Sequence, residues 1–112
     1  MYFFEYKNDQ LYCEGISIHH IAEKVGTPFY VYSYQTLVRH FTVFDKAFDG
    51  IPHLICFSAK ANSNLAILRL FTSMGAGVDV VSGGELYRAI KGGADPKKIV
   101  FSGVGKREDE IE

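Results

Sequence analysis

The feature of this sequence that most constrains its fold is a series of short apolar runs, each followed by a segment with helical periodicity. Residues 53–59 form a nearly unbroken apolar run, and Leu65, Leu68 and Phe71 then recur at the spacing of one helical face. Short runs of this kind are typical of strands buried on both faces, as in parallel sheets. Because the pattern repeats along the chain, it predicts an α/β fold in which helices cover a parallel sheet.

Four strands and several helices can be placed from these patterns. Strands are predicted over 29–32, 53–59, 78–81 and 99–102. Helices are predicted between an N-cap at Ser17 and a terminating Gly26, from about residue 34 to the breaker at 50–52, from 65 to 75, over 82–91, and from about 108 onward. Residues 3–13 alternate loosely around the turn signal Asn8-Asp9, which indicates a short strand or hairpin before the first helix.

About four βα units fit into the 112 residues of the chain. An open four-stranded sheet and the amino-terminal half of a (β/α)8 TIM barrel both agree with this pattern, and a complete barrel needs roughly 250 residues. A half-barrel leaves two sheet edges unpaired and one apolar face without its partner, which is an unstable arrangement for a lone protein. We therefore expect the chain to be a fragment of a longer protein.

The composition argues against several classes of function. The net charge is −1, with no basic run, so no strong field favours nucleic acid or an anionic membrane. No apolar run approaches the ~18 residues of a membrane span, and the amino terminus lacks the pattern of a secretory signal. Cys13 and Cys56 are far apart and fit no metal-ligand spacing, which predicts free thiols in a reducing cytoplasm.

Lys60 is the most informative residue for chemistry, because it ends a strand that is otherwise nearly all apolar. Alternation places it on the same face as Leu54, Cys56 and Ser58. In α/β folds the chemistry occurs at the carboxyl ends of the strands, and a partly desolvated lysine there can attack a carbonyl group as an amine nucleophile. The structural alternative is a lysine that extends from a strand end into solvent.

Asp79 is the second candidate, since it places a carboxylate inside the hydrophobic strand over 78–81. A buried carboxylate without a partner is costly, so a partner is expected, and Lys60 is a plausible one if the two strands are adjacent. A structural ion pair or a solvated aspartate at the strand end would explain the residue equally well.

Residues 82–85, Ser-Gly-Gly-Glu, fit the capping box of a helix start. In that arrangement the Ser82 hydroxyl accepts from the Glu85 N–H, and the Glu85 carboxylate accepts from the Ser82 N–H. Capping explains these residues more simply than catalysis does. The glycines would also let a ligand approach the backbone at the helix N-terminus.

Several of these segments resemble a known family. The stretch 57–64, FSAKANSN, is similar to the Y-A-x-K-A-N segment of the fold-type III pyridoxal-phosphate decarboxylases. Residues 75–86, 99–106 and 27–32 resemble the glycine-rich segment, the following strand and loop, and the first barrel strand of the diaminopimelate decarboxylases within that family. The match runs from about residue 15 to the end, in the same order and spacing.

The resemblance implies the cofactor, the fold and the site. It implies a pyridoxal 5′-phosphate-binding (β/α)8 barrel in which the lysine matching Lys60 holds the cofactor covalently. It implies that the residues matching Asp79 and Glu85 line the cofactor site, and we expect Ser58 to contact the cofactor as well. Residues 1–14 would belong to a second, β-sandwich domain, and residues 15–112 to the barrel.

The resemblance also implies an activity, which is decarboxylation of meso-2,6-diaminopimelate to L-lysine and CO2 by a cytoplasmic enzyme that is a homodimer. The residues that stack on the cofactor ring and bind its phosphate would lie beyond residue 112, so the chain alone is expected to be inactive. Two alternatives remain open at this point. One is a decarboxylase for ornithine, arginine or carboxynorspermidine, and the other is a non-catalytic relative that binds a protein partner.

Overall fold

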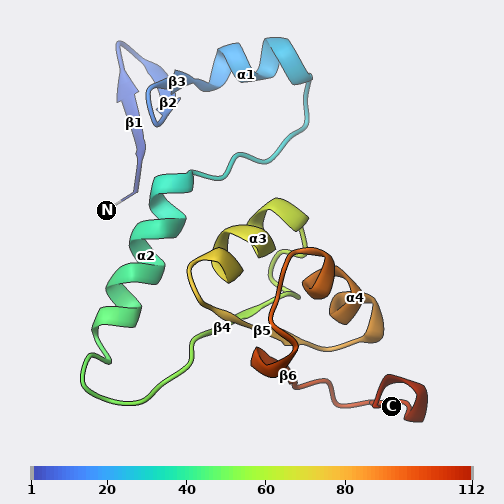
Figure 1. Ribbon diagram of the computed structural model, residues 1–112. Helices are drawn as coiled ribbons and strands as arrows, with labels where there is room; N and C mark the ends of the chain where they lie inside the picture. Colours follow the sequence, from blue (N-terminus) through green and yellow to red (C-terminus); the bar gives the residue numbers. More distant parts are fainter. Residues whose placement is uncertain (1, 112) are drawn as a thin grey trace. The chain divides into compact units, whose positions relative to one another are not determined.

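Three of the four apolar runs singled out in the sequence become strands in the computed structural model, which describes residues 2–111 (Figure 1). The chain divides into two compact units, which meet in sequence at Asp49 and Gly50. Among the described residues, none of the helices is both long and apolar enough to cross a lipid bilayer. Because the placement of the two units relative to each other is not determined, each is described by itself.

The second unit contains the predicted parallel sheet. Its strands are β4 (Cys56–Ser58), β5 (Gly77–Val80) and β6 (Ile99–Phe101), arranged in the order β4-β5-β6 with both neighbouring pairs parallel. Helix α3 (Leu65–Ser73) connects β4 to β5, and helix α4 (Gly83–Lys91) with the 3₁₀ turn η1 (Pro96–Lys98) connects β5 to β6. The α/β prediction is confirmed for this unit.

One face of this sheet packs against α3 and α4. Val78 and Val80 of β5 are fully buried there, together with Leu68 of α3 and Ala89 of α4. Burying a Val or Leu side chain contributes about 1.5–3 kcal/mol each, so these contacts are a main source of stability for the unit. The ring of Phe57 stacks on that of a helix residue, Phe71, with ring centroids 4.4 Å apart.

The strands approach each other closely at Gly77. A Cβ atom at this position would overlap the carbonyl oxygen of Lys98 and would lie 2.8 Å from the Cys56 Sγ. The lack of a side chain at Gly77 therefore makes room for the Cys56 thiol on the sheet face opposite the helices, since paired residues of parallel strands point to the same face.

The first unit begins with a three-stranded antiparallel sheet, β1 (Phe4–Lys7), β2 (Gln10–Cys13) and β3 (Ile16–Ser17). Asn8 and Asp9 form the turn between β1 and β2 with φ of 49° and 60°. Positive φ at both central residues is what a tight hairpin turn requires, and Asn and Asp tolerate it well. The predicted hairpin is confirmed, and the short third strand extends it.

Two helices complete the first unit, α1 (Ile18–Val25) and α2 (Tyr34–Lys46). Gly26 ends α1 with φ of 78°, as predicted, whereas Ser17 occupies the N-cap position without a side-chain capping bond. At the start of α2 the Ser33 Oγ accepts from the Thr36 N–H and donates to the Glu14 carboxylate at 2.5 Å.

Three predicted elements are shorter in the structure than the sequence indicated, or do not form. Residues 29–32 do not form a strand in the described structure, and Tyr30 is 90% exposed. An extended segment becomes a strand only when the backbone of a neighbouring segment pairs with it. The run 53–59 forms a ladder only over Cys56–Ser58, since the adjacent β5 is four residues long. The acidic segment near residue 108 forms a single 3₁₀ turn, η2 (Glu108–Glu110).

The close packing at Gly77 generates a prediction. Gly77→Ala is expected to lower the free energy of unfolding by about 1–3 kcal/mol, the cost of an extra group in a well-packed interior. Gly105→Ala is the matched control, because a Cβ at Gly105 meets nothing within 4 Å, and its effect is expected to stay within about 0.5 kcal/mol. Urea unfolding measures both, and equal stabilities for the two variants would contradict the prediction.

Candidate functional site

The polar residues of the sheet lie on the face opposite α3 and α4. The register pairs Ser58 with Asp79 and Asp79 with Val100, so the three side chains form one row across β4, β5 and β6. Cys56 and Gly77 form the row before it. The sequence therefore places a hydroxyl and a carboxylate side by side near the carboxyl ends of two parallel strands, where α/β folds bind their ligands.

Ser58 and Asp79 are joined by a hydrogen bond. The Ser58 Oγ donates to the Asp79 Oδ2 at 3.2 Å. The other carboxylate oxygen, Oδ1, is buried and has no hydrogen-bond partner within the described part of the chain. Leaving a buried acceptor unpaired costs about 1–3 kcal/mol, so this oxygen is suited to accept a hydrogen bond from a ligand.

Cys56 lies next to this pair as a neutral thiol. Burial raises the pKa of Cys56 above its ordinary value, and the negative charge of Asp79 raises it further. Because the thiolate is the nucleophilic and metal-binding form, Cys56 is poorly suited to either task at neutral pH. Both cysteines are free thiols, as predicted.

Lys60 follows β4 in a turn that the Ala61 N–H closes by donating to the Ser58 carbonyl oxygen at 3.1 Å. Its side chain is exposed. The strands β4 and β5 are adjacent, yet the expected ion pair between Lys60 and Asp79 is not formed among residues 2–111. Because this turn follows the ladder, Lys60 lies just beyond the carboxyl end of β4 and is exposed.

Glu85 takes part in capping at the end of β5. The Glu85 N–H donates to the Ser82 Oγ at 3.2 Å, as the capping box predicts. The return bond differs from the prediction, because the Glu85 Oε2 accepts from the Val81 N–H at 2.8 Å instead of from the Ser82 N–H. Glu85 therefore ties the start of α4 to the residue that follows β5.

A second carboxylate at the start of α4 was not anticipated from the sequence. The Glu110 Oε1 accepts from the Gly83 N–H at 2.8 Å, and its Oε2 accepts from the Arg107 N–H at 3.1 Å. These backbone hydrogen bonds, with that to Gly83 the larger influence, hold the pKa of Glu110 below its usual value. Arg107 stands where a capping box normally has Ser or Thr, so the sequence carried no signal for this contact.

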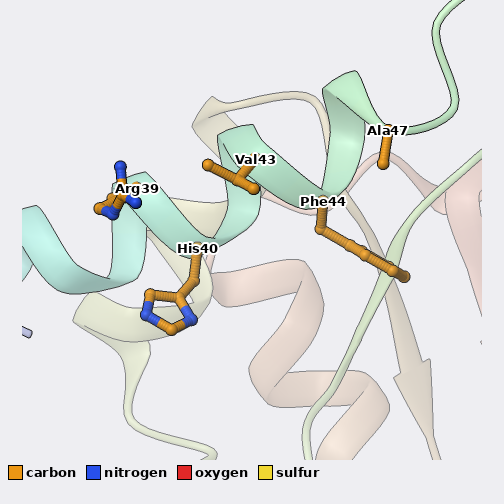
Figure 2. A pocket seen from close by; sticks show the side chains of 5 residues that line it. All are labelled: Arg39, His40, Val43, Phe44 and Ala47. Carbon is orange, nitrogen blue, oxygen red and sulfur yellow. The ribbon is translucent and has the colours of Figure 1, made fainter. Parts of the chain in front are cut away.

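The first unit contains a hollow lined by residues of one helix. It follows one side of α2 and contains no acidic side chain (Figure 2). Every residue that lines it comes from α2 or the residue that ends it, so it is the surface of a single helix. These residues are Arg39, His40, Val43, Phe44 and Ala47.

Comparison with known proteins places the chain in a family. Residues 34–112 match the family described as "Pyridoxal-dependent decarboxylase, pyridoxal binding domain". The diaminopimelate decarboxylase of Haemophilus influenzae is 50% identical over 111 residues, which cover 99% of this chain and 27% of that protein. The chain thus spans about a quarter of the length of the curated relatives it matches.

Solved structures agree with this result. The chain superposes on a diaminopimelate decarboxylase from M. jannaschii in complex with L-lysine, with a TM-score of 0.91 and 39% identity over 96% of this chain and 26% of that one. It superposes on the enzyme from Helicobacter pylori, also in complex with L-lysine, with a TM-score of 0.79 and 45% identity over 83% of this chain and 24% of that one. The chain belongs to the pyridoxal-dependent decarboxylase family and carries part of its pyridoxal-binding domain.

The residues present fit a pyridoxal phosphate cofactor. Lys60 offers a primary amine on an exposed turn, as covalent attachment of an aldehyde requires. The buried Oδ1 of Asp79 offers an unused acceptor to a cationic N–H group. The remaining candidates are more constrained, since Ser58 already donates to Asp79, and one carboxylate oxygen of Glu85 is already hydrogen-bonded.

The capping geometry predicts that two replacements of Glu85 behave differently. Glu85→Gln keeps an oxygen acceptor for the Val81 N–H, so its free energy of unfolding is expected to stay close to that of the wild type. Glu85→Ala leaves that N–H without its side-chain partner and is expected to lower the free energy of unfolding by about 1 kcal/mol. Denaturant unfolding compares the two variants. Equal decreases in their free energies of unfolding would contradict a stabilising role for the hydrogen bond that the Glu85 side chain accepts.

Proposed function

We propose that this chain is the amino-terminal part of a pyridoxal-phosphate-dependent carboxy-lyase that converts meso-2,6-diaminopimelate to L-lysine and CO2. The observation that carries the proposal is the pairing of β4 with β5, which sets Lys60 and the unpaired Oδ1 of Asp79 at the same end of the sheet. Support for the substrate comes from diaminopimelate decarboxylases that are about 50% identical, and from two related structures whose complexes contain L-lysine.

Three residues of the site act in the proposed reaction, namely Lys60, Asp79 and Glu85. When bound, pyridoxal phosphate supplies an electron-withdrawing ring that stabilises the electrons left on the α-carbon as CO2 departs. The Lys60 amine would hold the cofactor covalently through its aldehyde group. Asp79 orients a cationic N–H through Oδ1. Glu85 holds the end of β5 and the start of α4 in place through its bond to Val81.

The domain boundaries follow from the same proposal. Residues 1–14 contribute to a second, β-sandwich domain, and residues 15–112 to the barrel. The hairpin β1-β2 supports this division, because it ends at Cys13 and belongs to a different sheet from β4-β5-β6, although the short strand β3 (Ile16–Ser17) extends that sheet past residue 14. The compact units divide elsewhere, near residue 49, since α1 contacts β2 and β3, and the start of α2 is hydrogen-bonded to Phe3 and Glu14.

The assembly and the location are part of the proposal too. The complete enzyme is a cytoplasmic homodimer that acts on a small amino acid and binds neither nucleic acid nor membrane. Residues 1–112 alone lack activity, because the other contacts to the cofactor and the substrate come from later segments.

The assignment of Lys60 is tested by incubating the complete polypeptide that carries this sequence with pyridoxal phosphate, reducing with borohydride and mapping the labelled peptides. The label is expected on Lys60 and is lost in Lys60→Ala. Lys91→Ala, which removes an exposed helical lysine, serves as the control and retains the label. Label spread over many lysines, without preference for Lys60, would contradict the assignment.

A substrate panel separates the proposed function from its nearest alternative. Release of CO2 is expected from meso-2,6-diaminopimelate and at a far lower rate from ornithine, arginine and carboxynorspermidine. Lys60→Ala is expected to lower this rate by about 10²-fold or more, the scale on which loss of an essential catalytic group acts. A preference for ornithine or arginine would retain the cofactor assignment and overturn the substrate. Absence of activity with normal labelling would favour a non-catalytic relative that binds a protein.

A further inference from the structure

We infer that Ser58 is a positioning residue that acts through Asp79: its hydroxyl holds one oxygen of the Asp79 carboxylate, so that the other faces the cationic N–H group of the bound cofactor or of Lys60. The inference rests on the proposed function and deepens it. It differs from the expectation that Ser58 touches the cofactor directly, because it assigns the hydroxyl to a neighbouring side chain.

The row of side chains across the sheet leaves Ser58 as the donor for Asp79. Ser58 lies on one side of Asp79 in the parallel register, and Val100 lies on the other side. Valine offers no donor, whereas the Ser58 Oγ lies 3.2 Å from the Asp79 Oδ2 and donates to it. Within residues 2–111, this is the side-chain hydrogen bond that Asp79 receives.

The hydrogen bond from Ser58 determines which oxygen of the Asp79 carboxylate remains free. A carboxylate has two equivalent oxygens and can rotate about its last bond, so a single donor on one of them fixes the direction of the other. Here Oδ2 is taken by Ser58, and Oδ1 is buried without a partner. An acceptor that is both buried and unpaired costs free energy until a donor arrives, which suits an oxygen held ready for a ligand.

The preceding row of side chains offers no cationic donor to the Asp79 Oδ1. It consists of Gly77, which has no side chain, and Cys56, whose pKa is raised by burial and by the negative charge of Asp79. Cys56 therefore remains a neutral thiol. The first residue with a cationic side chain after β4 is Lys60, which lies two positions beyond Ser58.

A double-mutant cycle on the complete polypeptide tests this inference. The rate at which pyridoxal phosphate becomes attached to Lys60, trapped with borohydride, is measured for Ser58→Ala, Asp79→Asn and the double variant. Ser58→Ala is expected to slow attachment by about tenfold, the effect of losing one hydrogen bond to a charged group. In the Asp79→Asn background the same change is expected to have no further effect, because Ser58 acts through that carboxylate.

Two control variants and one spectroscopic measurement accompany the cycle. Ser58→Thr keeps the hydroxyl and is expected to restore the wild-type rate. Ser102→Ala removes an exposed hydroxyl just beyond β6 and is expected to leave the rate unchanged. In the cofactor-free protein, the ¹³C carboxyl resonance of Asp79, assigned with Asp79→Asn, is expected to move in Ser58→Ala and to stay in place in Ser102→Ala.

The outcomes separate the inference from the proposed function. If the wild type is not labelled at Lys60, the proposed function and the inference fall together. If the wild type is labelled and Ser58→Ala is labelled equally fast, only the inference is overturned. A loss in Ser58→Ala that persists in the Asp79→Asn background would also overturn it, and would indicate that Ser58 touches the cofactor itself.

Discussion

The structure of the second unit depends on one strand, β5, which pairs in parallel with a neighbour on each side. Its two faces have opposite characters. Val78 and Val80 are fully buried against α3 and α4, and Asp79 between them points to the other face. Burial of the two valines fixes the strand against its helices, and the ladders on both sides fix its register. A slip of one residue would turn the carboxylate into the apolar core and the valines out of it, so the position of Asp79 follows from the packing of its neighbours.

The same register explains why the candidate functional residues lie together at the carboxyl ends of β4 and β5. Parallel pairing brings the carboxyl ends of β4 and β5 to one edge, so Ser58, Asp79 and the following Lys60 lie on two neighbouring strand ends, although 21 positions separate Ser58 from Asp79. Close approach at Gly77 keeps the strands together one row earlier. Glu85 and Glu110 then hold the start of α4 against the chain that leaves the sheet. The segments that follow β5 and β6 are therefore hydrogen-bonded to the start of α4, and the Asp79 Oδ1 remains as an unused acceptor among the described residues.

Much of this fold could be predicted because its signals are local. The helices α1, α3 and α4 follow from apolar periodicity and from the terminating glycines, and the first hairpin follows from Asn8-Asp9. What could not be predicted depends on partners distant in the sequence. Residues 29–32 have the composition of a strand and yet lack a ladder in the described structure. The bond from Ser58 to Asp79, and that from Gly83 to Glu110, required the register or a long loop to be known.

We propose that the pairing of β4 with β5 places Lys60 and the free oxygen of Asp79 around one cofactor. A crystal structure of the complete polypeptide grown with pyridoxal phosphate tests it most directly. Continuous density is expected between the Lys60 Nζ and the cofactor, with the Asp79 Oδ1 within hydrogen-bond distance of a cationic N–H group and Oδ2 still bound to Ser58. A cofactor attached to another lysine, or an Asp79 side chain directed away from the cofactor, would contradict it.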